Sequence, residues 1–144
     1  MVRMSEPASA LKHVLLLEDD HDIRTLLRMF LEEQGLYVTM TDNAADARTI
    51  LERVKIDAMI SNMVLPGGTA FVAVDFARQK GIPALLITGS VEQMAQLEAD
   101  GEYFLAKPFR LAELTNRLYE LMARSANETG TIRDDLHLAS NKPA

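Results

Sequence analysis

Ile-Asp-Ala-Met-Ile-Ser-Asn-Met-Val-Leu-Pro-Gly-Gly, residues 56–68, is the stretch of the sequence that decides the fold. It predicts a short buried strand over Ala58 to Ser61, which Asn62 closes before a loop that contains Pro66 and two glycines. In an open parallel sheet, ligands bind just outside the carboxyl ends of the strands, so a polar residue here is a candidate site residue. Taken alone, such an asparagine more often does no more than end its strand. Whether it belongs to a site therefore depends on the residues that end the other strands.

The composition predicts one soluble domain. The chain has 144 residues, of which 48% are hydrophobic, a net charge of -6 and no cysteine. The negative charge argues against a general nucleic-acid or anionic-membrane surface, and the lack of cysteine removes disulfides, thiolate catalysis and cysteine metal ligands. No apolar run is long enough for a signal peptide or a membrane span. We expect a cytoplasmic protein with no membrane and no nucleic acid among its partners.

Strands and helices alternate along the chain. The expected strands are His13 to Leu17, Tyr37 to Met40, Ala58 to Ser61, Pro83 to Ile87 and Tyr103 to Ala106. An amphipathic helical pattern follows each strand, and in the first helix the apolar positions are Ile23, Leu26, Leu27, Phe30 and Leu31. Five such units predict an α/β fold: a doubly wound five-stranded parallel sheet in a three-layer α/β/α sandwich, with the common strand order 2-1-3-4-5.

That strand order brings four strand ends around one crevice. The polar residues at these ends are Glu18 and Asp19, Asn62, Thr88 and Lys107. Each has an ordinary explanation when taken singly, since strand ends are commonly polar and a lysine beside a turn is usually solvated. Their coincidence at one edge of the sheet makes the crevice the candidate site.

The expected domain covers residues 12–124. Residues 1–11 lack periodicity and are expected to form a flexible arm. Residues 125–144 are too short for an output domain, and they place Ile132, Leu136 and Leu138 in an otherwise polar segment. This extension is expected to be either disordered or docked on a partner or a second subunit.

Four motifs, in order and at matching spacing, give the chain a family resemblance. They are Val-Leu-Leu-Leu-Glu-Asp-Asp (residues 14–20), residues 56–67, Ala-Leu-Leu-Ile-Thr-Gly (residues 84–89) and Phe-Leu-Ala-Lys-Pro-Phe (residues 104–109). Together they resemble the receiver domain of two-component response regulators. The resemblance implies a flavodoxin-like, CheY-like fold and a stand-alone receiver that acts by protein-protein interaction in a phosphorelay. It further implies a sensor histidine kinase or a phosphotransfer protein as partner, and no enzymatic activity.

The resemblance also assigns roles to the crevice residues. Glu18, Asp19, the residue at position 62 and the main-chain carbonyl of Val64 would hold Mg²⁺, a hard cation that prefers oxygen ligands. Lys107 would pair with the phosphoryl oxygens. Thr88 would bind the phosphoryl group and move on activation, and Phe104 would change rotamer with it.

The chain departs from the family pattern at the phosphoacceptor, where Asn62 replaces an aspartate. An amide is a neutral and weak nucleophile, so we expect no phosphorylation and weakened Mg²⁺ binding. Two explanations stay open: an engineered substitution, and a natural pseudo-receiver that works as a phosphorylation-independent adaptor. A flavodoxin-like nucleotide or phosphate binder is less favoured, because acids stand where a glycine-rich loop would follow the first strand.

A partner surface is expected on the side of the fold that is packed most weakly. It comprises the short helix Val91 to Ala99, the fifth strand with Phe104, and the helix that starts near Leu111. A homodimer could form through this face or through the C-terminal extension.

Overall fold

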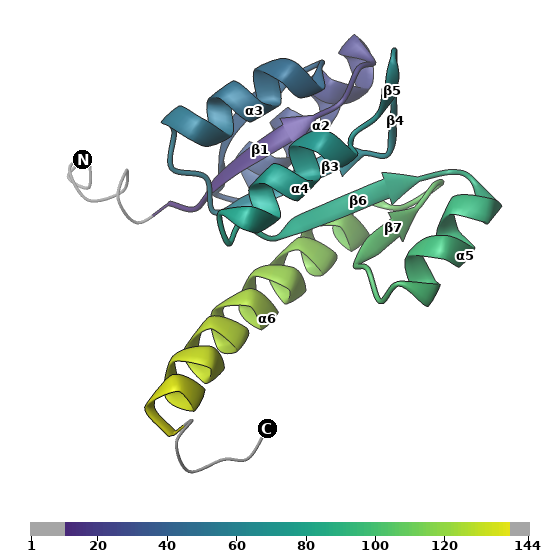
Figure 1. Cartoon of the computed structure of the whole chain (residues 1–144). Coiled ribbons are helices and arrows are strands. Elements are labelled where there is room, and N and C mark those ends of the chain that lie inside the picture. Colours follow the sequence, from purple (N-terminus) through teal and green to yellow (C-terminus); the bar gives the residue numbers. More distant parts are fainter. Residues whose placement is uncertain (1–10, 139–144) are drawn as a thin grey trace, which may run out of the picture.

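Five parallel strands form the central sheet of the protein (Figure 1). The computed structural model describes residues 11–138. The strands are β1 (His13–Leu17), β2 (Tyr37–Thr41), β3 (Ala58–Asn62), β6 (Ala84–Thr88) and β7 (Phe104–Ala106), and their order is β2-β1-β3-β6-β7. The predicted doubly wound α/β class and strand order are therefore confirmed.

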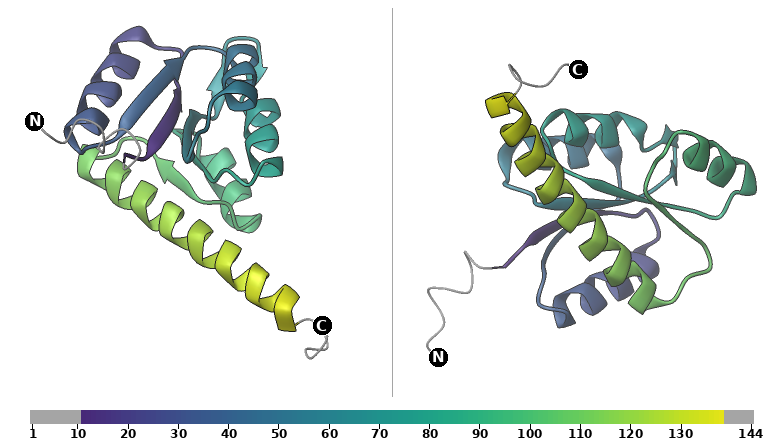
Figure 2. Two further views of the ribbon diagram at one scale, coloured as in Figure 1. Left: turned by 90° about the vertical axis from the view of Figure 1, so that its left-hand side faces the viewer. Right: turned by 90° about the horizontal axis from the view of Figure 1, so that it is seen from below.

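Helices cover both faces of this sheet (Figure 2). The helices are α2 (His21–Glu33), α3 (Ala44–Arg53), α4 (Phe71–Gln79), α5 (Val91–Ala99) and α6 (Leu111–Leu138). Because side chains alternate along a strand, Leu15 belongs to the apolar layer covered by α3, α4 and α5, whereas Leu16 belongs to the layer covered by α2 and α6. The two resulting apolar layers give the α/β/α sandwich. No helix within residues 11–138 has the length and apolarity needed to cross a membrane.

Side chains cap the starts of α2, α3, α5 and α6, whereas α4 has no side-chain cap. Asp20 accepts a hydrogen bond from the Ile23 N–H at the start of α2, and Asn43 and Ser90 do the same for α3 and α5. At α6, Arg110 is a poor cap by residue type, and the Glu113 carboxylate instead accepts the Arg110 N–H at 2.9 Å. Each cap satisfies a main-chain donor that has no partner inside its helix.

The structure differs from the sequence expectations in the loop after β3 and in the length of the last helix. The loop after β3 contains a small hairpin, β4 (Val64–Leu65) paired with β5 (Gly68–Thr69), which a two-residue strand is too short to reveal in the sequence. Gly67 at its turn has a φ of 92°, which favours glycine.

The second difference concerns the length of the last helix. α6 runs without interruption past Arg124 to Leu138, so the boundary predicted at Arg124 lies inside a helix. No proline stands in this segment, and the helix-favouring residues Ala123, Arg124 and Ala126 let it continue where a separate extension was expected. The predicted arm up to residue 10 and the last residues, 139–144, lie outside the described part of the chain.

The buried face of α2 is narrower than its apolar pattern. Leu27 and Leu31 are buried, whereas Ile23 and Leu26 are 40% and 53% exposed. Apolar residues spread over five positions of a helix cover a wider arc than the sheet and α6 can cover. The sequence pattern therefore predicted the helix correctly and its contact face too broadly.

The neighbours Leu26 and Leu27 provide a matched test of this packing. Leu27→Ala should lower the free energy of unfolding by about 2–5 kcal/mol, because it removes buried methyl groups and leaves a cavity. Leu26→Ala should change it by less than about 1 kcal/mol, because that side chain is half exposed. Urea unfolding of both variants would measure the difference, and similar losses would contradict the assigned face of α2.

Candidate functional site

Four strand ends meet at the carboxyl edge of the sheet. β3 pairs in parallel with β1 on one side and with β6 on the other, and β7 pairs with β6. Asn62 is the last residue of β3 and Thr88 the last of β6, while Glu18 follows β1 and Lys107 follows β7. A crevice of about 210 Å³ opens there, lined by Asn62, Thr88, Lys107 and six neighbouring residues. The strand order thus brings the predicted site residues to one place.

The side chain of Asn62 ties two sides of the site together. Its Nδ2 donates one hydrogen bond to Asp19 Oδ1 at 3.3 Å and another to the main-chain oxygen of Val64 at 3.1 Å. The first bond crosses from β3 to the segment after β1, and the second holds the start of the β4–β5 hairpin. The amide therefore closes the site from within, using both of its donor hydrogens.

Glu18 is a buried carboxyl group directly after β1. It is 3% exposed, and its Oε2 accepts the Asp20 N–H at 3.0 Å. Burial raises the pKa of Glu18, while the Asp20 N–H and the positive charge of Lys107 lower it in part. The site therefore disfavours a dense negative charge unless a cation lies nearby.

Thr88 is held toward α5 rather than left free in the crevice. The residue is 2% exposed, and its hydroxyl donates to Gln93 Oε1 and accepts the Ser90 N–H at 3.1 Å. Gln93 was not predicted as a site residue, although the spacing Ser90-x-x-Gln93 marks a helix start by a capping box. In the structure the Gln93 side chain binds Thr88 and so links the crevice to the first turn of α5.

Lys107 and Phe104 occupy the β7 side of the site. Lys107 lines the crevice, and its main-chain N–H donates to the Thr88 carbonyl at 2.8 Å. Phe104 is half-buried and packs against the apolar layer that contains Leu97 of α5. Its carbonyl accepts a hydrogen bond from Arg117 of α6 at 2.8 Å. Phe104 therefore contacts two helices at once.

The groups that would hold a metal are oxygen atoms, as a hard cation requires, but two of them are already hydrogen-bonded to the Asn62 amide. Glu18, Asp19 and the Val64 carbonyl are oxygen donors, which Mg²⁺ prefers. However, the Asn62 amide hydrogens bind Asp19 and Val64, which are two of these three donors. Among residues 11–138, no cluster of three or more histidine, cysteine, aspartate or glutamate side chains is placed to hold a metal ion. A cation would have to displace the amide first.

Comparison with known proteins identifies relatives of one kind. The family model described as the response regulator receiver domain matches residues 14–119. Protein PetR of Rhodobacter capsulatus is 32% identical over 116 residues, which cover 78% of this chain and 49% of PetR. The aerobic respiration control protein ArcA of Escherichia coli K12 is 28% identical over 127 residues, which cover 85% of this chain and 53% of ArcA. The chain spans about half the length of these curated relatives.

A solved structure agrees in fold. The receiver domain of the sensor histidine kinase PA1611 from Pseudomonas aeruginosa PAO1 is 27% identical, with a TM-score of 0.69. The match covers 79% of this chain and 99% of that domain, which has a magnesium ion coordinated in its active site cleft.

The amide at position 62 makes a prediction for metal binding. We expect the protein to bind Mg²⁺ weakly, and Asn62→Asp to tighten binding at least about tenfold, because it replaces two donor hydrogens with an anionic ligand. Asn116→Asp on the exposed side of α6 is the matched control, since it adds the same charge away from the site. Calorimetric titration would measure all three, and micromolar Mg²⁺ affinity in the unmodified protein would contradict the closed site.

Proposed function

Because this chain belongs to the response regulator receiver domain family of two-component signalling, we propose that it is a receiver that signals by binding partners without accepting a phosphoryl group. The observation that carries the proposal is Asn62, whose amide stands at the end of β3 and bonds to Asp19 and to the Val64 carbonyl. The site is thereby satisfied internally. The protein would act as a binding module and catalyse no reaction of its own.

The chemistry of the amide supports this proposal. In phosphorylation of a receiver, a carboxylate oxygen attacks phosphorus and an acyl phosphate forms. An amide oxygen is neutral and weakly nucleophilic, and in Asn62 the amide is also engaged through its nitrogen in two hydrogen bonds. An unphosphorylated receiver with one fixed crevice conformation is what a phosphorylation-independent adaptor requires. An engineered replacement of an aspartate would leave the same closed crevice.

The proposed partners are a sensor histidine kinase or a phosphotransfer protein, consistent with the family. The Mg²⁺ affinity of the site would be weakened by Asn62, as its hydrogen bonds suggest. A nucleotide or phosphate binder is the weaker alternative, because the residues after β1 are the acids Glu18 and Asp19 rather than a glycine-rich loop.

We place the partner surface on α5, β7 and the first turns of α6. Within α5 the described side chains include a single buried one, Leu97, and Val91 at its start is 77% exposed. The bond between Thr88 and Gln93 connects this helix directly to the crevice. A partner that contacts α5 would therefore sense the state of Thr88, and a second receiver could use the same face.

A single substitution tests the proposed chemistry. With acetyl phosphate and Mg²⁺, Asn62→Asp should become phosphorylated, since its carboxylate oxygen can form the acyl phosphate and release acetate. The unmodified protein and Asn62→Gln should remain unlabelled. Intact-mass measurement gives the readout. Labelling of the unmodified protein would overturn the proposal, and an inert Asn62→Asp would show that the crevice differs from a competent receiver in more than this residue.

A second experiment tests the partner surface. Val91→Glu should weaken binding of the kinase or phosphotransfer partner at least about tenfold, because it buries a charge in the proposed contact. Val72→Glu is the matched control, since Val72 is 64% exposed on α4, outside the proposed surface. Calorimetry would compare the two variants, and equal affinities would remove α5 from the interface.

A further inference from the structure

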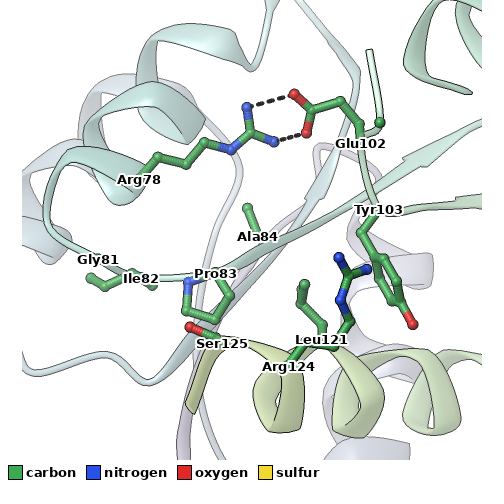
Figure 3. Close-up of a pocket in the computed structure, with 11 residues that line it drawn as sticks. Arg78, Gly81, Ile82, Pro83, Ala84, Glu102, Tyr103, Leu121, Arg124 and Ser125 are labelled. Atoms are coloured by element: carbon green, nitrogen blue, oxygen red, sulfur yellow. Dashed lines mark hydrogen bonds and ion pairs between the residues drawn. The ribbon is translucent and has the colours of Figure 1, made fainter. Parts of the chain in front are cut away.

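A basic groove lies at the edge of the sheet opposite the Asn62 crevice, where the strands begin. It consists of two adjoining hollows of about 710 Å³ and 380 Å³, and Figure 3 shows the smaller one. Both hollows are lined by Gly81, Ile82, Pro83 and Ser125, so they meet at the point where α6 crosses the start of β6. We call the two together the amino-edge groove.

The walls of the amino-edge groove combine apolar and cationic side chains. The larger hollow is lined by Lys12, Lys55 and Lys80 against a single acid, Asp57, whose carboxylate accepts the His13 N–H at 2.7 Å. Apolar walls are supplied by Leu51, Val54, Ile56, Ile82 and Met122. The surplus of positive charge stands out in a chain with a net charge of -6.

The smaller hollow repeats this chemistry with arginines. Arg78 and Arg124 face it together with Tyr103, and Figure 3 shows them around Pro83 and Leu121. Glu102 is engaged by both guanidinium nitrogens of Arg78, and Arg124 lies over the Tyr103 ring at 5.1 Å. Arg78 and Glu102 therefore neutralise each other, so Arg124 supplies the positive charge of this hollow.

The end of α6 has the complementary chemistry. Residues 127–138 contain Glu128, Asp134 and Asp135 against one basic residue, Arg133. Ile132 and Leu136 are four residues apart in the sequence, a spacing typical of an amphipathic helix. The sequence of this segment therefore combines acidic residues with apolar residues at helical spacing, as a ligand of the amino-edge groove should.

The backbone of this segment leaves the rest of the domain. Figure 1 and the left view of Figure 2 show the C-terminal part of α6 extending away from the other elements. A helix end gains little stability in water without packing, and Gly130 is a poor helix former within it. A stable helix here therefore calls for a partner surface.

The same chain cannot supply that surface. Ser125 and Ala126 form part of the groove wall, and the helix continues from them to Leu138 without a break. To enter its own groove, the segment would have to reverse direction within one or two residues. A second molecule can approach without any change in either helix.

We propose that two copies of this chain form a dimer in which the α6 end of each copy, residues 127–138, occupies the amino-edge groove of the other. A two-fold axis near the point where α6 leaves the domain fills both grooves by one operation, as in most protein dimers. In this dimer the acidic residues of each segment face the lysines of the partner groove, and the apolar residues of the segment cover the apolar walls of that groove. The arrangement involves neither Asn62 nor its crevice, so it stands or falls independently of the proposed function.

Charge reversal in the full chain tests the dimer. Analytical ultracentrifugation at several concentrations should show a dimer, and Lys12→Glu/Lys55→Glu should raise its dissociation constant at least about tenfold. Asp134→Lys/Asp135→Lys should weaken it similarly. Mixing these two double variants should restore assembly, because opposite charges face each other in both grooves of the mixed dimer. Salt should weaken the unmodified dimer, since ionic screening shortens to about 3 Å at 1 M.

Arg53→Glu serves as the control, because Arg53 is a cation at the end of α3 that lines neither hollow. It should leave the dimer unchanged, and circular dichroism should show every variant folded. A chain that is monomeric at all concentrations would overturn the proposal. A dimer insensitive to the lysine and aspartate reversals would also overturn it, as would one that the mixed variants fail to restore.

Discussion

The parallel pairing of β3 with both β1 and β6 is the constraint on which the rest of the structure depends. It aligns the strands in one direction, so that all their carboxyl ends lie at one edge and all their amino ends at the other. This alignment brings Asn62 close to Asp19 and Thr88, although the three residues are far apart in the sequence. The same alignment collects the lysines of the amino-edge groove at the opposite edge.

The Asn62 amide changes the electrostatic balance of the carboxyl edge. A receiver site with three carboxylates needs a cation to hold them together, because like charges at short range repel. Here the amide supplies two donor hydrogens in place of one negative charge, and it binds Asp19 directly. The buried Glu18 is then the remaining group whose charge is disfavoured by its surroundings. The crevice thus has a stable arrangement made from protein groups alone.

Sequence patterns predicted the parts of the structure that depend on repetition. Five alternating units were enough for the sheet order, and apolar strands that end in polar residues were enough to find the crevice. Side-chain contacts were less accessible: the bond between Thr88 and Gln93 depends on a rotamer at the start of α5, and the exposure of Leu26 depends on how α2 is rotated. The length of α6 was missed because its continuation past Arg124 has weak local signals, with Gly130 and several β-branched residues.

The placement of two surfaces at opposite edges of one sheet has a consequence for binding strength. A molecule that contacts the carboxyl edge leaves the amino edge uncovered, and an assembly formed at the amino edge leaves the crevice open. Two receivers joined through α6 would therefore present two crevices on one rigid body. A partner with two matching sites would bind such a pair with a high effective concentration for its second contact, and avidity would then set the response.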